Sequence, residues 1–163
     1  AKAAIASGVA RKPIVDWEEY SEILRERMGL DNKMLRRFYD MAKQTPKRVV
    51  FSESNHLNML KAAETCVNEG ICYPVLLGNE EKIASIAAEN QISLEGVEIV
   101  NLRHDREESR RLHYAKLLSE KRSREGYTFQ EAAEQMFNRD SFGMMMVESG
   151  DADALMSPEA CGR

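Results

Sequence analysis

The stretch KRVVFSESNHLNMLKAAETCVNEG, residues 47–70, decides the fold. It opens with Val49, Val50 and Phe51, a short continuous apolar run that is typical of a strand covered by helices on both faces. Apolar residues at helical spacing follow, and Gly70 stands where a left-handed residue ends a helix. The stretch therefore predicts a strand, a tight polar turn and an amphipathic helix, the first half of a βαβ unit.

The polar turn carries the first candidate site residues. Ser52, Glu53, Ser54 and Asn55 follow the predicted strand, and Ser54 or Asn55 is expected to cap the helix. Open parallel sheets bind ligands beyond the carboxyl ends of their strands, where this turn lies. Glu53 is expected either to orient a ligand or act as a base, or only to support the helix through its macrodipole.

The rest of the chain predicts the same alternation of strands and helices. Asp140 is expected to cap the last helix. Pro74 points to a strand start or an edge strand. Glu107 is expected to pair with Arg111. The order predicts an α/β fold with a doubly wound, mostly parallel sheet, helices on both faces, and two linker helices in front. The predicted helices cover residues 17–28, 31–45, 80–90, 106–124, 128–137 and 140–150, and the further strands 72–77, 97–101 and 152–156.

The composition excludes several classes of protein. The chain has 163 residues, of which 43% are apolar and 31% charged, which suits one domain with a core. A net charge of −4 argues against a general nucleic-acid binder. Because the sequence shows no apolar run near the roughly 20 residues that span a bilayer and no signal-peptide pattern, we expect a cytoplasmic protein without a membrane partner.

Other polar clusters leave their roles open. Lys121, Arg122 and Arg124 are expected either to hold a phosphate or only to stabilise the carboxyl end of their helix. The histidines lack the spacing of a zinc helix, so no metal site is predicted. The sequence also lacks a Gly-rich dinucleotide fingerprint, a P-loop and a nucleophile elbow.

Five ordered motifs resemble the amino-terminal half of the phosphate acetyltransferase/butyryltransferase family. Residues 6–29 are similar to the end of the catalytic part of bacterial malic enzymes and the linker after it. Together they resemble the hybrid NADP-dependent malic enzymes, which implies a linker and helical arm over residues 1–46 and a phosphotransacetylase-like domain over residues 47–163. The five motifs are KRVVFSES, LKAAE, PVLLGNEEKI, REGYTFQEAAEQM and FGMMMVESGDADALMS.

This resemblance carries functional expectations. The parent enzymes oxidise malate to pyruvate and CO2 with NADP and Mg or Mn, in a catalytic domain of the same polypeptide. This part is expected to bind no cofactor itself, to sense acetyl-CoA or assist assembly, and to belong to a homo-oligomer. The alternative is part of a phosphate acetyltransferase, which moves acetyl between CoA and phosphate.

The resemblance also assigns roles to individual residues. Arg122 falls where the transferases have an arginine implicated in CoA binding, and Glu53 matches the acid of the family's first turn. The family's catalytic residues lie in the second half of its domain, so none is expected here, and Pro158 departs from the family's Ser-Gly pattern. The candidate acetyl-CoA or phosphate ligands are Glu53, Ser54, Asn55, Arg122 and Ser157.

Overall fold

The structure is a computed structural model that describes residues 5, 7–8, 14–27 and 33–157. The chain divides into two compact units, Ala1–Met41 and Ala42–Arg163. Helix α2 (Trp17–Arg27) belongs to the first unit, and α3 (Lys33–Gln44) crosses the division, so two helices precede the first strand as predicted. Pro158 lies outside the described residues, and the domain boundary after residue 46 stays a prediction.

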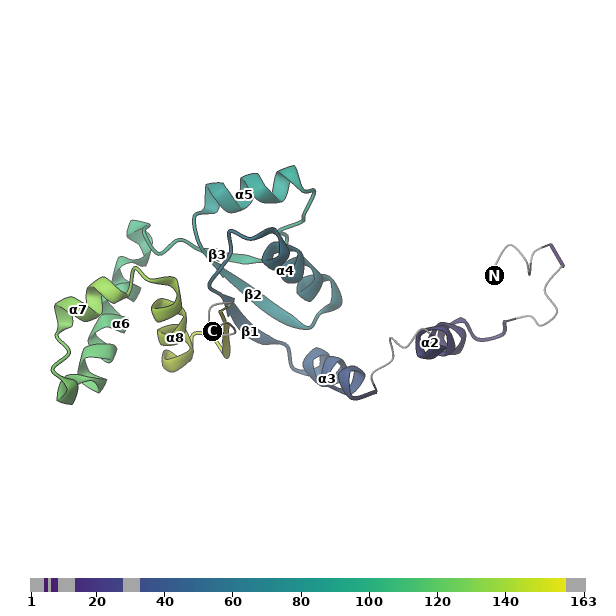
Figure 1. Cartoon of the computed structure of the whole chain (residues 1–163), viewed down its shortest axis with the longest axis horizontal. Coiled ribbons are helices and arrows are strands. Elements are labelled where there is room, and N and C mark those ends of the chain that lie inside the picture. Colours follow the sequence, from purple (N-terminus) through teal and green to yellow (C-terminus); the bar gives the residue numbers. More distant parts are fainter. Residues whose placement is uncertain (1–4, 6, 9–13, 28–32, 158–163) are drawn as a thin grey trace. The chain divides into compact units, whose positions relative to one another are not determined.

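The second unit alternates strands and helices in the predicted order (Figure 1). Its parts are β1 (Lys47–Phe51), α4 (Leu57–Glu69), β2 (Cys72–Leu77), α5 (Glu80–Glu89), β3 (Glu98–Val100), η1 (Asp105–Glu107), α6 (Glu108–Lys121), η2 (Ser123–Glu125), α7 (Phe129–Gln135), α8 (Arg139–Ser149) and β4 (Ala154–Met156).

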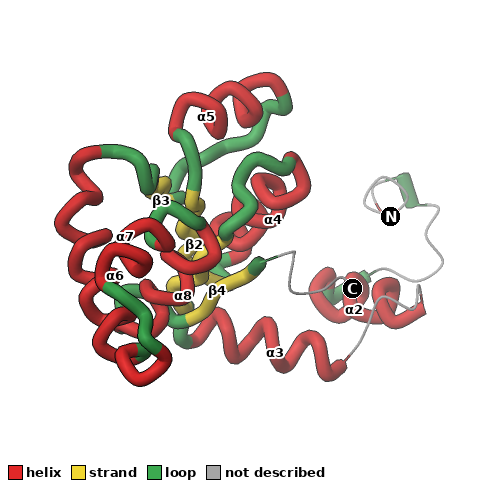
Figure 2. Tube along the Cα trace, turned by 60° about the vertical axis from the view of Figure 1, so that its left-hand side comes forward, coloured by secondary structure: helices red, strands yellow, loops and turns green. Residues whose placement is uncertain are grey.

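The described strands form one parallel sheet in the order β3-β2-β1-β4, with helices around it (Figure 2). Val50 in β1 pairs with Val75 in β2 on one side and with Leu155 in β4 on the other. The chain runs outward from β1 through β2 to β3, and then returns to place β4 on the opposite side of β1. This reversal makes the sheet doubly wound, which confirms the predicted fold class.

Two separate apolar clusters cover the two faces of the sheet. Val50 and Val75 point to the cluster that includes Met146 of α8, whereas Phe51 and Leu76 point to the cluster on α4 and α5. Consecutive residues of a strand point to opposite faces of the sheet, so consecutive residues of β1, and likewise of β2, pack into opposite clusters. Figure 1 shows the same division, with α4 and α5 on one side of the sheet and α6, α7 and α8 on the other.

Two predicted helix caps are wrong. His56, rather than Ser54 or Asn55, is the residue before α4, and it makes no side-chain capping bond. Asn138, rather than Asp140, caps α8, because its side-chain oxygen accepts from the Ser141 amide at 3.1 Å. Both helices nevertheless end where predicted, at Gly70 and Gly150, which adopt φ angles of 67° and 84°.

Pro74 is the third residue of an interior strand, which corrects the expectation of a strand start or an edge strand. The sheet tolerates it because β3 pairs with β2 only from Val75 onward. Pro74 therefore lacks a partner strand on the β3 side, where a missing amide costs no ladder bond.

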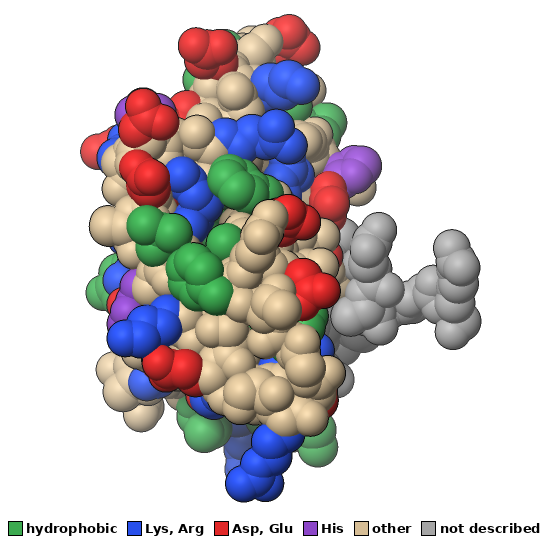
Figure 3. Space-filling model, turned by 90° about the vertical axis from the view of Figure 1, so that its left-hand side faces the viewer, with side chains coloured by type: hydrophobic (Ala, Val, Ile, Leu, Met, Phe, Trp, Pro, Cys, Tyr) green, Lys and Arg blue, Asp and Glu red, His purple; other side chains and the backbone are tan. Residues whose placement is uncertain are grey.

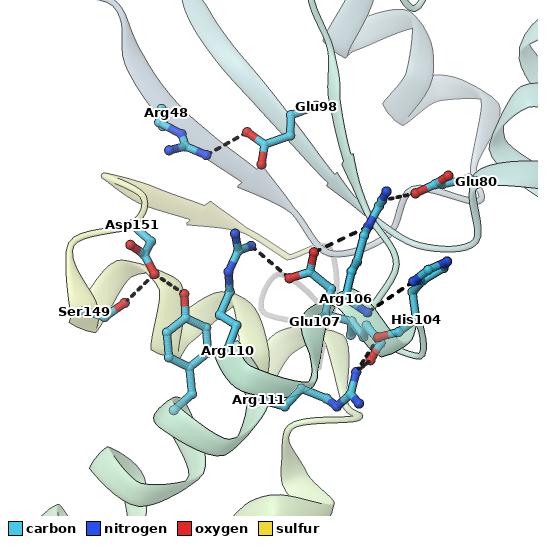
Figure 4. Close-up of polar contacts among 12 residues, drawn as sticks. Arg48, Glu80, Glu98, His104, Arg106, Glu107, Arg110, Arg111, Ser149 and Asp151 are labelled. Atoms are coloured by element: carbon cyan, nitrogen blue, oxygen red, sulfur yellow. Dashed lines mark hydrogen bonds and ion pairs between the residues drawn. The ribbon is translucent and has the colours of Figure 1, made fainter.

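The predicted pair between Glu107 and Arg111 is also wrong (Figure 4). Glu107 pairs instead with Arg110 at 3.2 Å and with Arg106 at 3.6 Å. Arg111 donates to the carbonyl oxygens of Leu102 at 2.5 Å and His104 at 3.0 Å. The 3-10 turn η1 puts Glu107 before the α-helix, so the regular i, i+4 spacing does not hold there.

Candidate functional site

The loop after β1 lies at the carboxyl edge of the sheet, where the strand order reverses. The buried Ser54 hydroxyl donates to the Leu77 carbonyl oxygen at the end of β2, at 2.5 Å. On the other side, the Ser52 amide donates to the Met156 carbonyl oxygen at the end of β4, at 3.2 Å. The loop is thus held between two strand ends, at the point where doubly wound sheets bind ligands.

This arrangement brings four of the five predicted residues to one edge. Glu53, Ser54 and Asn55 are consecutive in the loop, and Ser157 follows Met156, the residue that bonds to Ser52. The Ser52 hydroxyl is buried and has no hydrogen-bond partner. Most buried hydroxyls are paired, so an unpaired one at this edge marks a place for a further polar group.

Arg139 is the site residue that sequence reasoning missed. As the first residue of α8, it places Nη1 3.9 Å from Glu53 Oε2. The Asn55 side-chain oxygen, in the amide orientation favoured by its neighbours, accepts from Arg139 Nη2 at 3.0 Å. A cation at a helix amino terminus is unfavourable, because it opposes the helix macrodipole. This position is the feature of the sequence that could have marked Arg139 as a site residue.

A pocket of about 350 Å³ opens beside Arg139 at the carboxyl edge, and we call it the carboxyl-edge pocket. Residues that follow β2 and β3 form much of its wall, together with α5 and the start of α8. Its lining residues are Gly78, Asn79, Lys82, Asn101, Leu102, Arg103, Phe137 and Arg139.

Arg122 lies in a different pocket, of about 410 Å³, which we call the Arg122 pocket. Its guanidinium carbon lies 5.9 Å from the centre of the Tyr127 ring, and its Nη1 is 4.0 Å from Glu125 Oε2. None of Glu53, Ser54, Asn55 and Ser157 lines this pocket. The full lining is Leu118, Lys121, Arg122, Tyr127, Gln135, Ser141, Met144, Met145 and Glu148.

The face formed by α6, α7 and α8 has mixed charge. Figure 3 shows Lys and Arg side chains interleaved with acidic and hydrophobic ones there. On the same helices, Lys121 pairs with Glu148. The basic side chains of this face are thus partly neutralised in place.

The described residues offer no donor set for a metal ion. Among them, no group of three His, Cys, Asp or Glu side chains is arranged to hold one. No helix in the described part of the chain is long and apolar enough to cross a membrane. The Mg or Mn expected for the parent enzyme is therefore assigned to no residue here.

The fold and the polar carboxyl edge define the class of protein: a doubly wound α/β domain with its candidate ligand pockets on one sheet edge and along α8. Residues 33–160 match the phosphate acetyl/butaryl transferase family. The chain belongs to that family, as its motifs predicted.

Individual relatives include two kinds of enzyme. The chain is 34% identical to an NADP-dependent malic enzyme of Rhizobium meliloti over 96% of its length, and spans 21% of that protein. It is 37% identical to a phosphate acetyltransferase of Acetivibrio thermocellus over 76% of its length, and spans 36% of that protein. The EutD phosphotransacetylase from Staphylococcus aureus shares the fold, with a TM-score of 0.66 and 24% identity over 76% of this chain and 36% of its own.

Proposed function

We propose that this chain is a non-catalytic, acetyl-CoA-sensing domain of an NADP-dependent malic enzyme. The extent of the similarity carries the proposal. The family match begins at residue 33, whereas the malic enzyme match covers 96% of the chain and so takes in most of the preceding segment. That segment would join the domain to a catalytic part in the same polypeptide.

The Arg122 pocket supplies chemistry that suits the nucleotide end of acetyl-CoA. Arg122 offers a guanidinium for a phosphate, and Tyr127 offers an aromatic face for a base. Leu118 and Met145 add apolar wall. The loop residues Glu53, Ser54 and Asn55, with Ser157, are our candidates for contacts to the rest of the effector.

An effector at this domain regulates malate oxidation only if it binds two states of the whole enzyme unequally. The test is titration of the full-length protein with acetyl-CoA while malate-dependent NADP reduction is followed. We expect acetyl-CoA to change the rate or the apparent malate affinity, and an unchanged rate and affinity would defeat the proposal.

Substitution of Arg122 localises the effect. Arg122→Gln is expected to raise the acetyl-CoA concentration that gives half the maximal effect about tenfold, because it removes one charge-assisted hydrogen bond. Arg124→Gln is the matched control, since it removes an exposed charge two residues away that does not line the pocket. Equal shifts in both variants would show a general charge effect instead of a site.

The second candidate is part of a phosphate acetyltransferase, favoured by the 37% identity to the Acetivibrio thermocellus enzyme. The two candidates differ in one assay, the transfer of acetyl between CoA and phosphate by the full-length protein. We expect no transfer, and robust transfer without malate oxidation would select the second candidate.

A further inference from the structure

The carboxyl-edge pocket concentrates positive charge from three separate elements. Lys82 comes from α5, Arg103 follows β3, and Arg139 begins α8. No lining residue of this pocket is acidic. Three cations that converge on one concavity repel each other, so their placement favours an anion between them.

Local carboxylates leave this charge largely uncompensated. Within the described residues, neither Lys82 nor Arg103 makes an ion pair, and the one carboxylate that pairs with Arg139 is Glu53, at 3.9 Å. Glu80, next to the pocket residue Asn79, is occupied by Arg106 (Figure 4). The pocket is therefore electropositive, although the whole chain carries a net charge of −4.

Neutral groups in the pocket add further donors. The Asn79 side-chain oxygen accepts from the Lys82 amide at 3.0 Å, and that of Asn101 accepts from the Arg103 amide at 3.2 Å. These bonds use the oxygens and leave the side-chain NH2 groups of both asparagines to donate to a ligand.

Phe137 gives the pocket an apolar wall. Its ring is half-exposed, and the Arg111 guanidinium carbon lies 4.9 Å from the ring centre. Arg111 is itself held by two carbonyl oxygens, so the ring has a fixed neighbour. A ligand in the pocket would thus meet cations and amide donors together with an aromatic surface.

We propose that the carboxyl-edge pocket binds a small organic phosphate. The phosphate oxygens would lie among Lys82, Arg103 and Arg139, and the carbon part would lie against Phe137. A phosphate dianion presents several oxygens, which suits cations that approach from different elements, and guanidinium groups bind it in a bidentate manner. A volume of about 350 Å³ matches a ligand of small-metabolite size.

This site is separate from the Arg122 pocket, and its existence does not depend on the proposed sensing of acetyl-CoA. Calorimetric titration of the full-length protein with phenyl phosphate tests it. We expect saturable one-site binding, tighter than that of inorganic phosphate because Phe137 contacts the ring, and undetectable binding of phenol.

Two variants place the binding in the pocket. Lys82→Gln and Arg103→Gln are each expected to weaken phenyl phosphate binding about tenfold, because each removes one charge-assisted contact. Lys61→Gln, an exposed cation on α4 outside the pocket, should bind like the parent protein. Lys82 and Arg103 are both exposed and make no ion pair within the described residues, so the two pocket variants should fold, which circular dichroism checks.

The outcomes separate this proposal from the previous one. Unchanged acetyl-CoA titrations in Lys82→Gln, with phenyl phosphate binding lost, support two independent sites. No saturable phenyl phosphate binding, or the same loss in Lys61→Gln as in the pocket variants, would overturn the phosphate site and leave the acetyl-CoA proposal untouched.

Discussion

At the scale of single residues, Gly78 and Ser54 depend on each other. A Cβ at position 78 would collide with the Ser54 hydroxyl oxygen, which is bonded to the Leu77 carbonyl oxygen. Glycine at the end of β2 thus gives the loop after β1 room to attach to the sheet. The position of Glu53 and Asn55 follows from this attachment.

Gly78→Ala should lower the free energy of unfolding by about 1–3 kcal/mol, because the new methyl group displaces the Ser54 hydroxyl. Ser54→Ala should cost about 1 kcal/mol through the lost hydrogen bond. In the double variant, Gly78→Ala should cost less, since the Ser54 Cβ is 3.6 Å from the added atom, an ordinary contact, and only the Ile83 Cδ1 at 3.1 Å still has to shift. Urea unfolding of the four proteins measures this, and strict additivity would contradict the coupling.

Tyr114 is a buried residue whose protonation couples to stability. Its hydroxyl donates to Asp151, which also accepts from Ser149 (Figure 4). Burial, together with the Asp151 carboxylate, raises the pKa of Tyr114 from 10.0 to about 12.

The unfolded chain therefore loses the Tyr114 proton first as the pH rises. The protonated Tyr114 hydroxyl stabilises the folded state fully below pH 10.0, and this contribution is lost as the pH climbs toward about 12. Over that range the free energy of unfolding falls by about 1.4 kcal/mol per pH unit. Tyr114→Phe should be less stable than the parent at pH 8, and the difference should shrink or reverse by pH 11. Urea unfolding at both values checks this, and a constant difference would argue against the raised pKa.

At the scale of elements, the start of α8 sets the position of Arg139. Asn138 caps the helix through the Ser141 amide, and Arg139 follows directly with its contacts to Glu53 and Asn55. The cap therefore supports both the helix and the wall of the carboxyl-edge pocket.

Asn138→Ala should cost about 1 kcal/mol of stability through the lost cap, and should also weaken phenyl phosphate binding through the displaced Arg139. Asn58→Ala, at an exposed position inside α4, is the control and should be neutral or slightly stabilising, because alanine is the better helix former. Thermal unfolding and calorimetry of both variants provide the measurement. Equal destabilisation by the two substitutions would contradict a specific cap.

At the scale of the whole second unit, the sheet separates two apolar clusters. Ile83 and Leu60 belong to the cluster on α4 and α5, whereas Met146 and Phe142 belong to the one on α6, α7 and α8. Since no described residue belongs to both clusters, a cavity in one should leave the packing of the other intact.

Ile83→Val should cost about 1 kcal/mol and Met146→Ala about 2–5 kcal/mol, because both side chains are fully buried. The double variant should lose the sum to within about 0.5 kcal/mol. Denaturant unfolding of the single and double variants tests this, and a coupling above about 1 kcal/mol would show that the faces communicate through the sheet.

Much of the fold could be predicted because local patterns carry it. The apolar run at Val49–Phe51 and the terminating glycines Gly70 and Gly150 indicate strand and helix ends without tertiary information. The cap of α8 was harder to predict, because Asn138 and Asp140 are both good capping residues. Only the structure shows that Asn138 caps the helix.

The sequence by itself determined the strands, the helices, their order and the loop that follows β1, because apolar periodicity and glycine conformation act over a few residues. It also carried the motifs of the family. Only the tertiary structure decided that Arg139 reaches Glu53, that Lys82 and Arg103 share a pocket with it, and that Arg122 lies elsewhere. These groupings join residues far apart in the chain, and they arise from the strand order and from which face each helix covers, which no short stretch encodes.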